Sequence, residues 1–98
     1  MTKYQRLIND LAENNIGKMK AFGFSMLPLI KSGSMLTFST KEKYEKGDIV
    51  FCKVKGRFID AHLVTKVDKN KGYMIANNKG YENGWTKIIY GYVIEIEK

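Results

Sequence analysis

The sequence has few of the residues that build disulfide-rich, metal-binding or membrane-spanning proteins. Cys52 is its one cysteine and His62 its one histidine, so neither an internal disulfide nor a familiar Cys/His zinc motif can be assembled. No run approaches the roughly 18 consecutive apolar residues that a transmembrane helix needs. Residues 1–15 are too polar for a secretory signal peptide. We therefore expect a cytoplasmic protein with no cofactor, no metal and no membrane contact.

What is present is an ordinary globular composition with an excess of positive charge. Hydrophobic residues make up 44% of the 98 residues and charged residues 28%, which predicts one folded domain over residues 1–98. The net charge of +7 favours an acidic partner or a phosphate backbone. The basic residues are scattered, however, and a solvated basic surface accounts for them equally well. Cys52 lies in the apolar run IVFCKV and is interpreted as a small strand hydrophobe.

Residues 1–15 carry the spacing of an amphipathic helix. Apolar side chains recur at positions i, i+3, i+4 and i+7, namely Tyr4, Leu7, Ile8 and Leu11. Thr2 can cap the start of this helix, and Asn14, Asn15 and Gly17 can end it. The polar face is mixed in charge, so we expect the apolar stripe to pack on the rest of the domain.

Residues 18–98 read as short strands separated by Gly- and Asn-rich turns. We predict one helical turn at 26–31 and strands at 18–22, 35–39, 48–54, 58–67, 73–76 and 88–96. The segment YENGW, residues 81–85, is predicted to be a turn in which Trp85 packs. This pattern predicts a mainly β fold, either a coiled antiparallel sheet or a partly open barrel, with one N-terminal helix. The strand at 88–96 is a candidate exposed edge, and a homodimer can form through such an edge.

The segment GFSMLP, residues 23–28, places a serine at the start of a turn. Gly23 permits unusual backbone angles and Pro28 favours a helical turn. Backbone N–H groups at the start of such a turn are unpaired. Those of Ser25 and of a neighbour, Phe24 or Met26, can stabilise an oxyanion if Ser25 attacks a carbonyl. The same geometry also suits a serine that merely caps the turn.

A serine nucleophile needs a base, and His62 is the one side chain whose ordinary chemistry supplies it near neutral pH. His62 lies in the predicted strand FIDAHLVTKV with Asp60 two residues earlier. Side chains two residues apart share a face of a strand at roughly 6.5 Å of chain rise, so Asp60 can orient His62 only over a long separation. The alternative is that His62 is a half-buried structural residue.

The ordered combination of motifs resembles the serine peptidase clan that includes LexA-like repressors, UmuD-like proteins and signal peptidases. The resemblance runs from about residue 22 to the C-terminus: GFSMLPLIKSGSM matches the nucleophile motif, GDIV at 47–50 the next motif, and Gly91-Tyr92-Val93 the closing strand. It implies the fold of the LexA C-terminal domain, Ser25 as nucleophile and a base 62 − 25 = 37 residues later. His62 in AHLV resembles the histidine version of this clan rather than the lysine version, and Lys66 lies too far along the strand.

The sequence departs from the clan at the acidic residue that accompanies the histidine base. The Gly-Asp-Asn segment of the clan appears here as Ala76-Asn77-Asn78, so the acidic residue found there in histidine-type members is missing. Either Asp60 or an asparagine, Asn77 or Asn78, orients His62, or nothing does. This puts catalytic power in doubt more than the fold.

Three functions follow from these residues. The first is a stand-alone soluble serine peptidase, of a kind typical of phages or mobile elements, that cuts an extended protein segment with a Ser25–His62 dyad. The second keeps the fold as a weak or inactive peptidase-like module that binds a repressor or other regulator. The third is a basic β domain that binds nucleic acid through Tyr81 and Trp85, which the scattered charge does not favour.

Overall fold

The computed structural model describes residues 1–97, which form one helix followed by seven strands. The elements are α1 (Lys3–Asn14), β1 (Ile16–Lys20), β2 (Met35–Ser39), β3 (Ile49–Val54), β4 (Arg57–Asp68), β5 (Gly72–Ala76), β6 (Glu82–Thr86) and β7 (Ile89–Glu97). All strand pairs are antiparallel and belong to one sheet of order β1-β2-β7-β3-β4-β5-β6. The sheet is not closed, so the predicted mainly β fold with an N-terminal helix is confirmed.

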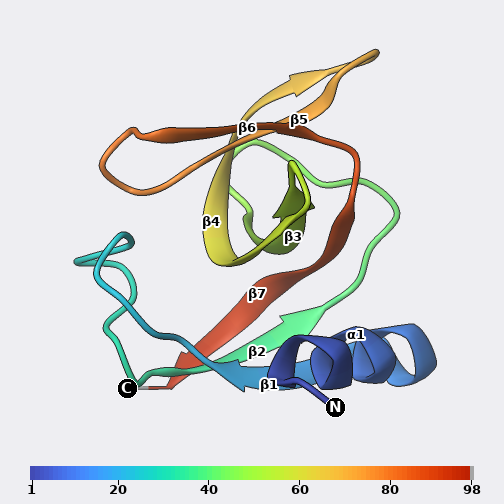
Figure 1. Ribbon diagram of the computed structural model, residues 1–98, viewed down its shortest axis with the longest axis vertical. Helices are drawn as coiled ribbons and strands as arrows, with labels where there is room; N and C mark the ends of the chain where they lie inside the picture. The colour runs from blue at the N-terminus through green and yellow to red at the C-terminus, as the bar shows by residue number, and fades with distance from the viewer. Residues whose placement is uncertain (98) are drawn as a thin grey trace.

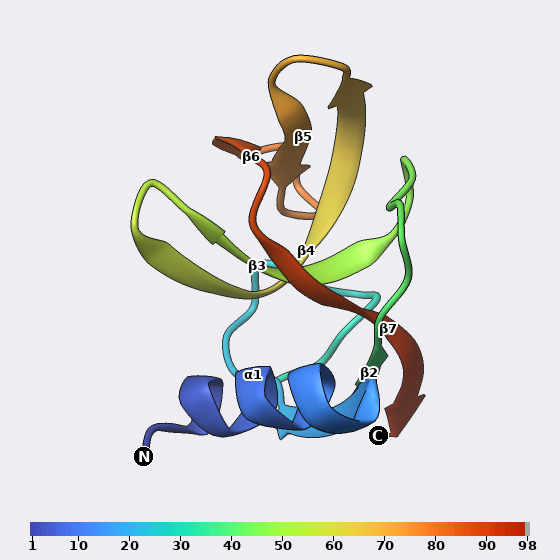
Figure 2. The same cartoon turned by 90° about the vertical axis from the view of Figure 1, so that its right-hand side faces the viewer.

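The sheet is strongly coiled. Figure 1 shows β1, β2 and α1 at one end of the molecule and the β3–β6 strands at the other, with β7 running between them. β4 is the longest strand, and Figure 2 shows it passing from its hairpin with β3 to its hairpin with β5. Its first half is paired with β3 and its second half, from Leu63, with β5. The segment between β1 and β2 packs beside the first half of β4, where the site described below lies.

Helix α1 begins and ends as its sequence predicts. The Thr2 hydroxyl accepts a hydrogen bond from the Gln5 N–H at 3.1 Å, and Asn15 takes a left-handed conformation at φ 62° while its N–H donates to Leu11. Leu7 and Leu11 bury the apolar stripe against the sheet. A Cβ at Gly91 of β7 would lie 2.8 Å from the Ser39 carbonyl oxygen and 3.1 Å from Leu11, so a glycine is needed for this close approach.

Strand β3 is buried on both faces, which explains its continuous apolar run. Phe51 faces one cluster, with α1, β1, β2 and the Ser25 segment. Val50 and Cys52 face a second cluster with Val64 and Ile75. The alternation follows from the two-residue period of a strand. Burial raises the pKa of the Cys52 thiol to about 12, so Cys52 is a protonated core side chain rather than a reactive thiol.

Two predicted features of the C-terminal third are wrong. The last strand, β7, lies between β2 and β3 and is not an edge; β1 and β6 are the edges of the sheet. In the segment predicted as a turn, residues 81–85, all residues after Tyr81 belong instead to strand β6. An Asn-Gly pair is a strong turn signal. Here Asn83 is the extra residue of a β-bulge opposite β5, and Gly84 has a φ of 134°, so both residues fit within the strand.

The remaining element predictions hold with small shifts. β1 begins two residues before its predicted start, and the predicted helical turn at 26–31 is a single turn with one bond from the Ile30 N–H to the Met26 carbonyl at 3.0 Å. Within residues 1–97, none of the helical structure has the length and apolar character that crossing a bilayer requires.

Candidate active site

The turn that carries Ser25 is fixed to the core by apolar anchors on its far side. Met26 and Ile30 are buried in the cluster that contains Phe51, whereas Ser25 itself is half-buried. Gly23 adopts a φ of 99°, which favours glycine, and its N–H donates to the Ser32 hydroxyl at 3.2 Å. The turn therefore holds the Ser25 hydroxyl at the surface of a cleft while Met26 and Ile30 anchor the turn in the core.

Asn78 clamps the same turn from the loop after β5. Its side-chain Nδ2 donates to the Leu27 carbonyl at 2.9 Å, and its backbone N–H donates to the Ser25 carbonyl at 3.2 Å. Asn77 instead organises its own loop, because its Oδ1 accepts from the N–H groups of Lys79 and Tyr81. Neither asparagine hydrogen-bonds to His62. Both contribute to the position of the Ser25 turn or of the loop that leads to β6.

His62 lies on β4 with its ring between two partners from distant parts of the chain. Its Nε2 is 3.0 Å from the Ser25 Oγ, and its Nδ1 is 2.7 Å from Oδ1 of Asn83 on β6. A carbonyl oxygen can only accept, so Nδ1 carries the proton in this arrangement. In the neutral ring Nε2 then carries no proton and can accept a hydrogen bond from the Ser25 hydroxyl. Ser25, His62 and Asn83 thus form a hydrogen-bonded chain of a hydroxyl, an imidazole and an amide.

The sequence does not indicate Asn83 as a site residue, because Asn83 lies in the segment predicted to be a turn. It is the bulge residue of β6, with Ile75 paired to Gly84 on one side and Ala76 paired to Glu82 on the other. A bulge redirects a side chain out of the regular alternation of a strand. The sequence signal for it is the Asn-Gly pair itself, which marks unusual backbone geometry but not what the asparagine contacts.

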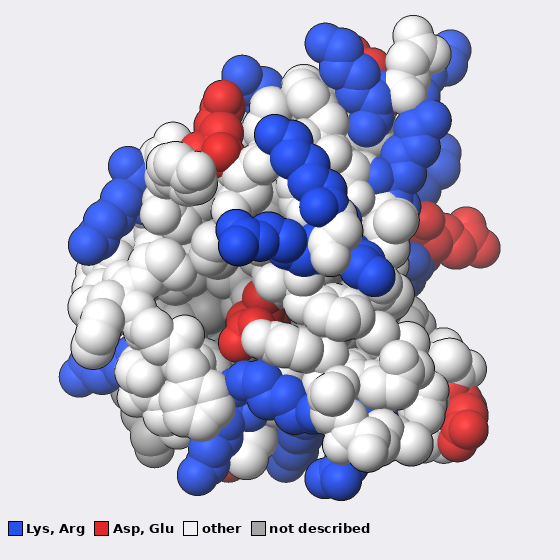
Figure 3. Space-filling model, in the orientation of Figure 1, with Lys and Arg blue, Asp and Glu red and all other residues white. Residues whose placement is uncertain are grey.

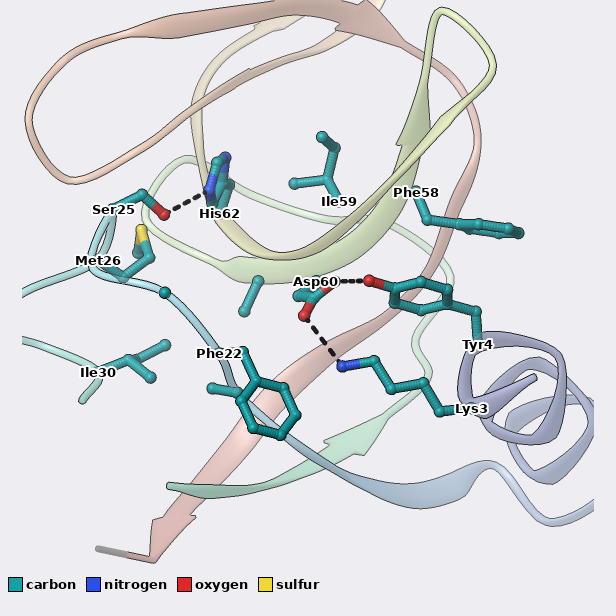
Figure 4. Close-up of a pocket in the computed structure, with 13 residues that line it drawn as sticks. Lys3, Tyr4, Phe22, Ser25, Met26, Ile30, Phe58, Ile59, Asp60 and His62 are labelled. Carbon is teal, nitrogen blue, oxygen red and sulfur yellow. Dashed lines mark hydrogen bonds and ion pairs between the residues drawn. The ribbon is translucent and has the colours of Figure 1, made fainter. Parts of the chain in front are cut away.

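Asp60 lies in the same cleft but contacts other groups. Its Oδ1 accepts from the Tyr4 hydroxyl at 2.6 Å, and its Oδ2 is 3.5 Å from the Lys3 ammonium, both residues belonging to α1. Burial, together with the hydrogen bond and charge of Asp60, raises the pKa of Tyr4 to about 12. Figure 4 shows Asp60 turned toward Tyr4 and Lys3, while His62 is turned toward Ser25.

Two further kinds of group considered from the sequence have defined positions: the Lys66 ammonium and the backbone N–H groups around Ser25. The Lys66 ammonium lies 3.4 Å from a Glu82 carboxylate oxygen on an exposed part of the sheet. Within residues 1–97, no hydrogen bond engages the backbone N–H groups of Phe24, Ser25 or Met26. These donors lie beside the Ser25 hydroxyl, where a developing oxyanion would be. Phe24 is 69% exposed, so its side chain takes no part in the core.

The cleft has a volume of about 380 Å³ and is bounded by the Ser25 turn, the first half of β4 and the start of α1. The face drawn in Figure 3 is hollowed, with acidic atoms in the hollow and Lys and Arg side chains around it. Among the described residues, no three His, Cys, Asp or Glu side chains are grouped to hold a metal ion.

The two aromatic residues considered for nucleic-acid stacking differ in exposure. Tyr81 is 69% exposed, whereas Trp85 is half-buried on β6 with the Lys71 ammonium 5.2 Å from its ring centroid.

Comparison with protein families supplies one match. The model of the family described as Peptidase S24-like matches residues 3–90, which include α1, β1 to β6 and the start of β7. A comparison with curated proteins finds none that matches the sequence.

Proposed function

The chain belongs to the Peptidase S24-like family, and we propose that it is a serine peptidase in which Ser25 is the nucleophile and His62 the general base. The observation that supports this most is the 3.0 Å contact between Ser25 Oγ and His62 Nε2, made across 37 residues of sequence. A nucleophile and a base within hydrogen-bond reach, with the base held by a third group, are what activation of a serine requires. Asn83, which holds the base at 2.7 Å, is the positioning residue.

The reaction follows from these positions. Ser25 Oγ attacks the scissile carbonyl carbon while its proton passes to His62 Nε2, and the free N–H groups of Ser25 and its neighbours stabilise the oxyanion. His62 then donates that proton to the leaving amine, which gives an acyl ester on Ser25. Water, deprotonated by His62, attacks the ester and restores the serine.

The first half of β4 is the surface on which an extended substrate would lie. Residues 57–62 are paired with β3 on one side, and the ladder with β5 begins only at Leu63. A strand with one unpaired side can accept an extended peptide through main-chain hydrogen bonds. The apolar residues that line the cleft include Ala21, Met26, Ile30 and Ala61, which suits a small apolar side chain of the substrate.

The proposed activity is tested by mass spectrometry of a diverse peptide mixture incubated with the native protein and with Ser25→Ala. We expect cuts that appear only with the native protein. Only a neutral imidazole can act as the base, so the rate of cleavage should fall on acidification as the ring takes up a proton. No cut that depends on Ser25, in folded protein at high concentration, would contradict the proposal.

Asn83 gives a separate prediction. Asn83→Ala is expected to lower kcat by about 10- to 100-fold with little change in KM. The His62 ring would no longer be held in one tautomer and orientation, whereas the substrate cleft would be unchanged. Asn83→Asp should retain most of the activity and move the acidic limb of the pH–rate profile to higher pH, since a carboxylate stabilises the imidazolium. Equal activity of native protein and Asn83→Ala would show that Asn83 does not position the base.

A second function, a peptide-binding module without turnover, is favoured by one feature. The group that holds His62 is the neutral amide of Asn83, which orients the ring but does not neutralise the charge that it acquires. Binding of extended peptides without any cut that depends on Ser25 would support this second function.

A further inference from the structure

The end of the cleft away from Ser25 is occupied by a positively charged side chain of the protein, that of Lys3. The Lys3 ammonium lies 3.5 Å from Asp60 Oδ2, 4.5 Å from the centroid of the Phe22 ring and 5.2 Å from that of Tyr4. Figure 4 shows these groups together on the opposite side of the cleft from Ser25 and His62. A carboxylate and aromatic faces around one ammonium are the chemistry that recognises Lys or Arg side chains.

The carboxylate of this site is held in place independently of Lys3. The Tyr4 hydroxyl donates to Asp60 Oδ1 at 2.6 Å and stays protonated, because its pKa is raised to about 12. Tyr4 is itself stacked on Phe58, with 4.9 Å between ring centroids. Asp60 therefore presents its second oxygen, Oδ2, to the cleft with a fixed orientation, and the proposed reaction leaves this oxygen unused.

Lys3, by contrast, is held weakly. Its side chain is 40% exposed and its contact with Asp60 is an ion pair near the surface, a class that contributes little stability. The position of α1 is set by the buried Leu7 and Leu11, not by Lys3. A second cation can therefore replace the Lys3 ammonium without displacing the helix.

The spacing on β4 relates this site to the scissile bond. Asp60 and His62 are two residues apart on β4, and both line the cleft. Between Ile59 and His62, β4 has one residue more than the facing part of β3, so the regular two-residue alternation is interrupted there. A side chain that reaches Asp60 therefore belongs to a residue close to, but different from, the one beside Ser25 and His62.

We propose that Asp60, Phe22 and Tyr4 form a subsite for a Lys or Arg side chain of an extended peptide, and that Lys3 occupies this subsite when no peptide is bound. The position of that residue relative to the scissile bond rests on the proposed peptidase function, whereas the binding site itself does not. The net charge of +7 would attract acidic peptides over the whole surface. Within the cleft, however, Asp60 is the one carboxylate among the described lining residues, and it would select a basic residue.

The subsite is tested by binding in the Ser25→Ala background, so that turnover is not needed. The probes are mixtures of decapeptides that are random except for one central residue, which is fixed as Lys, norleucine or Glu. Peptides retained by the protein are counted by mass spectrometry. We expect Lys mixtures to be retained about 3- to 10-fold better than norleucine mixtures, with a smaller ratio at high salt.

Substitutions at the subsite make the test specific. Asp60→Asn keeps an acceptor for Tyr4 and should bring the Lys-to-norleucine ratio close to one, whereas Lys3→Ala should raise it because the competing ammonium is gone. Asp68→Asn, the same charge change at the distant end of β4, is the matched control and should leave the ratio unchanged. Three results would overturn the subsite: a Lys-to-norleucine ratio of one in the Ser25→Ala protein, a preference for Glu mixtures, or an equal fall of the ratio with Asp68→Asn.

Cleavage by the protein with Ser25 intact, measured on the same mixtures, separates the two proposals. Cuts without any preference for Lys would leave the peptidase standing and reject the subsite. A Lys preference in binding without any cut would leave the subsite standing and reject the peptidase.

Discussion

Ser25→Ala, His62→Ala and the double variant are each expected to lower the rate of peptide cleavage by about 10³- to 10⁶-fold, and by nearly the same factor. In the proposed mechanism the hydroxyl and the imidazole, 3.0 Å apart, act as one unit, so that once either is removed the other has no remaining role. A serine without its base is a weak nucleophile, and a base without the serine has no proton to accept. The residual rate would come from the oxyanion donors and from substrate binding.

The measurement is kcat/KM for one peptide identified in the digest, determined for the four proteins under the same conditions. A cycle in which the two single effects add would contradict a nucleophile–base pair, because independent residues add and coupled residues do not. Circular dichroism of each variant verifies that the fold is retained.

Lys66→Ala is the matched control for the identity of the base. Lysine is the base in the bacterial members that the sequence resembles, but here the Lys66 ammonium is 3.4 Å from Glu82 and both side chains are about half exposed. Removing it should change the rate by less than about two-fold, as for a surface ion pair. Loss of activity in Lys66→Ala with activity retained in His62→Ala would identify a serine–lysine enzyme and reject the pair described above.

The parts of the fold that could be predicted are those with strong local signals. The capped helix with Leu7 and Leu11, and the apolar run of β3 that contains Phe51, were identified because their periodicity is carried by adjacent residues. Strand order could not be read in this way. β7 reads as an edge from its alternating composition, yet it lies inside the sheet between β2 and β3, because this pairing is decided by tertiary contacts.

The candidate site also contains residues that could be predicted from the sequence and residues that could not. Ser25 and His62 could be proposed because a serine in GFSMLP and a single histidine are distinctive in sequence, and the structure places their side chains in contact. Asn83 could not, because a β-bulge depends on the register between two strands. Asp60 was a reasonable partner for His62 by spacing alone, but its carboxylate contacts Tyr4 from α1, a helix whose docking the strand pattern does not reveal.

Phe51→Ala is expected to lower the free energy of unfolding by about 3 to 5 kcal/mol, the largest stability effect expected for one substitution in this core. Phe51 is fully buried, and its ring lies 4.9 to 6.1 Å, between centroids, from those of four other aromatic residues: Tyr4, Phe38, Phe58 and Tyr90. Alanine would leave a cavity between the sheet and α1 that fixed strands on both sides cannot fill. A domain of this size has only about 5 to 15 kcal/mol of stability to lose.

Urea unfolding followed by circular dichroism measures this loss as a lower midpoint at unchanged slope. Phe24→Ala removes the same ring from a side chain that is 69% exposed and should change the free energy of unfolding by less than about 0.5 kcal/mol. Because Phe51 also stacks on Tyr4 and Phe58, which line the cleft, its loss should loosen α1 and weaken the hold on Asp60 before the Ser25–His62 contact is affected. Equal effects of Phe51→Ala and Phe24→Ala would mean that this aromatic cluster does not hold the helix to the sheet.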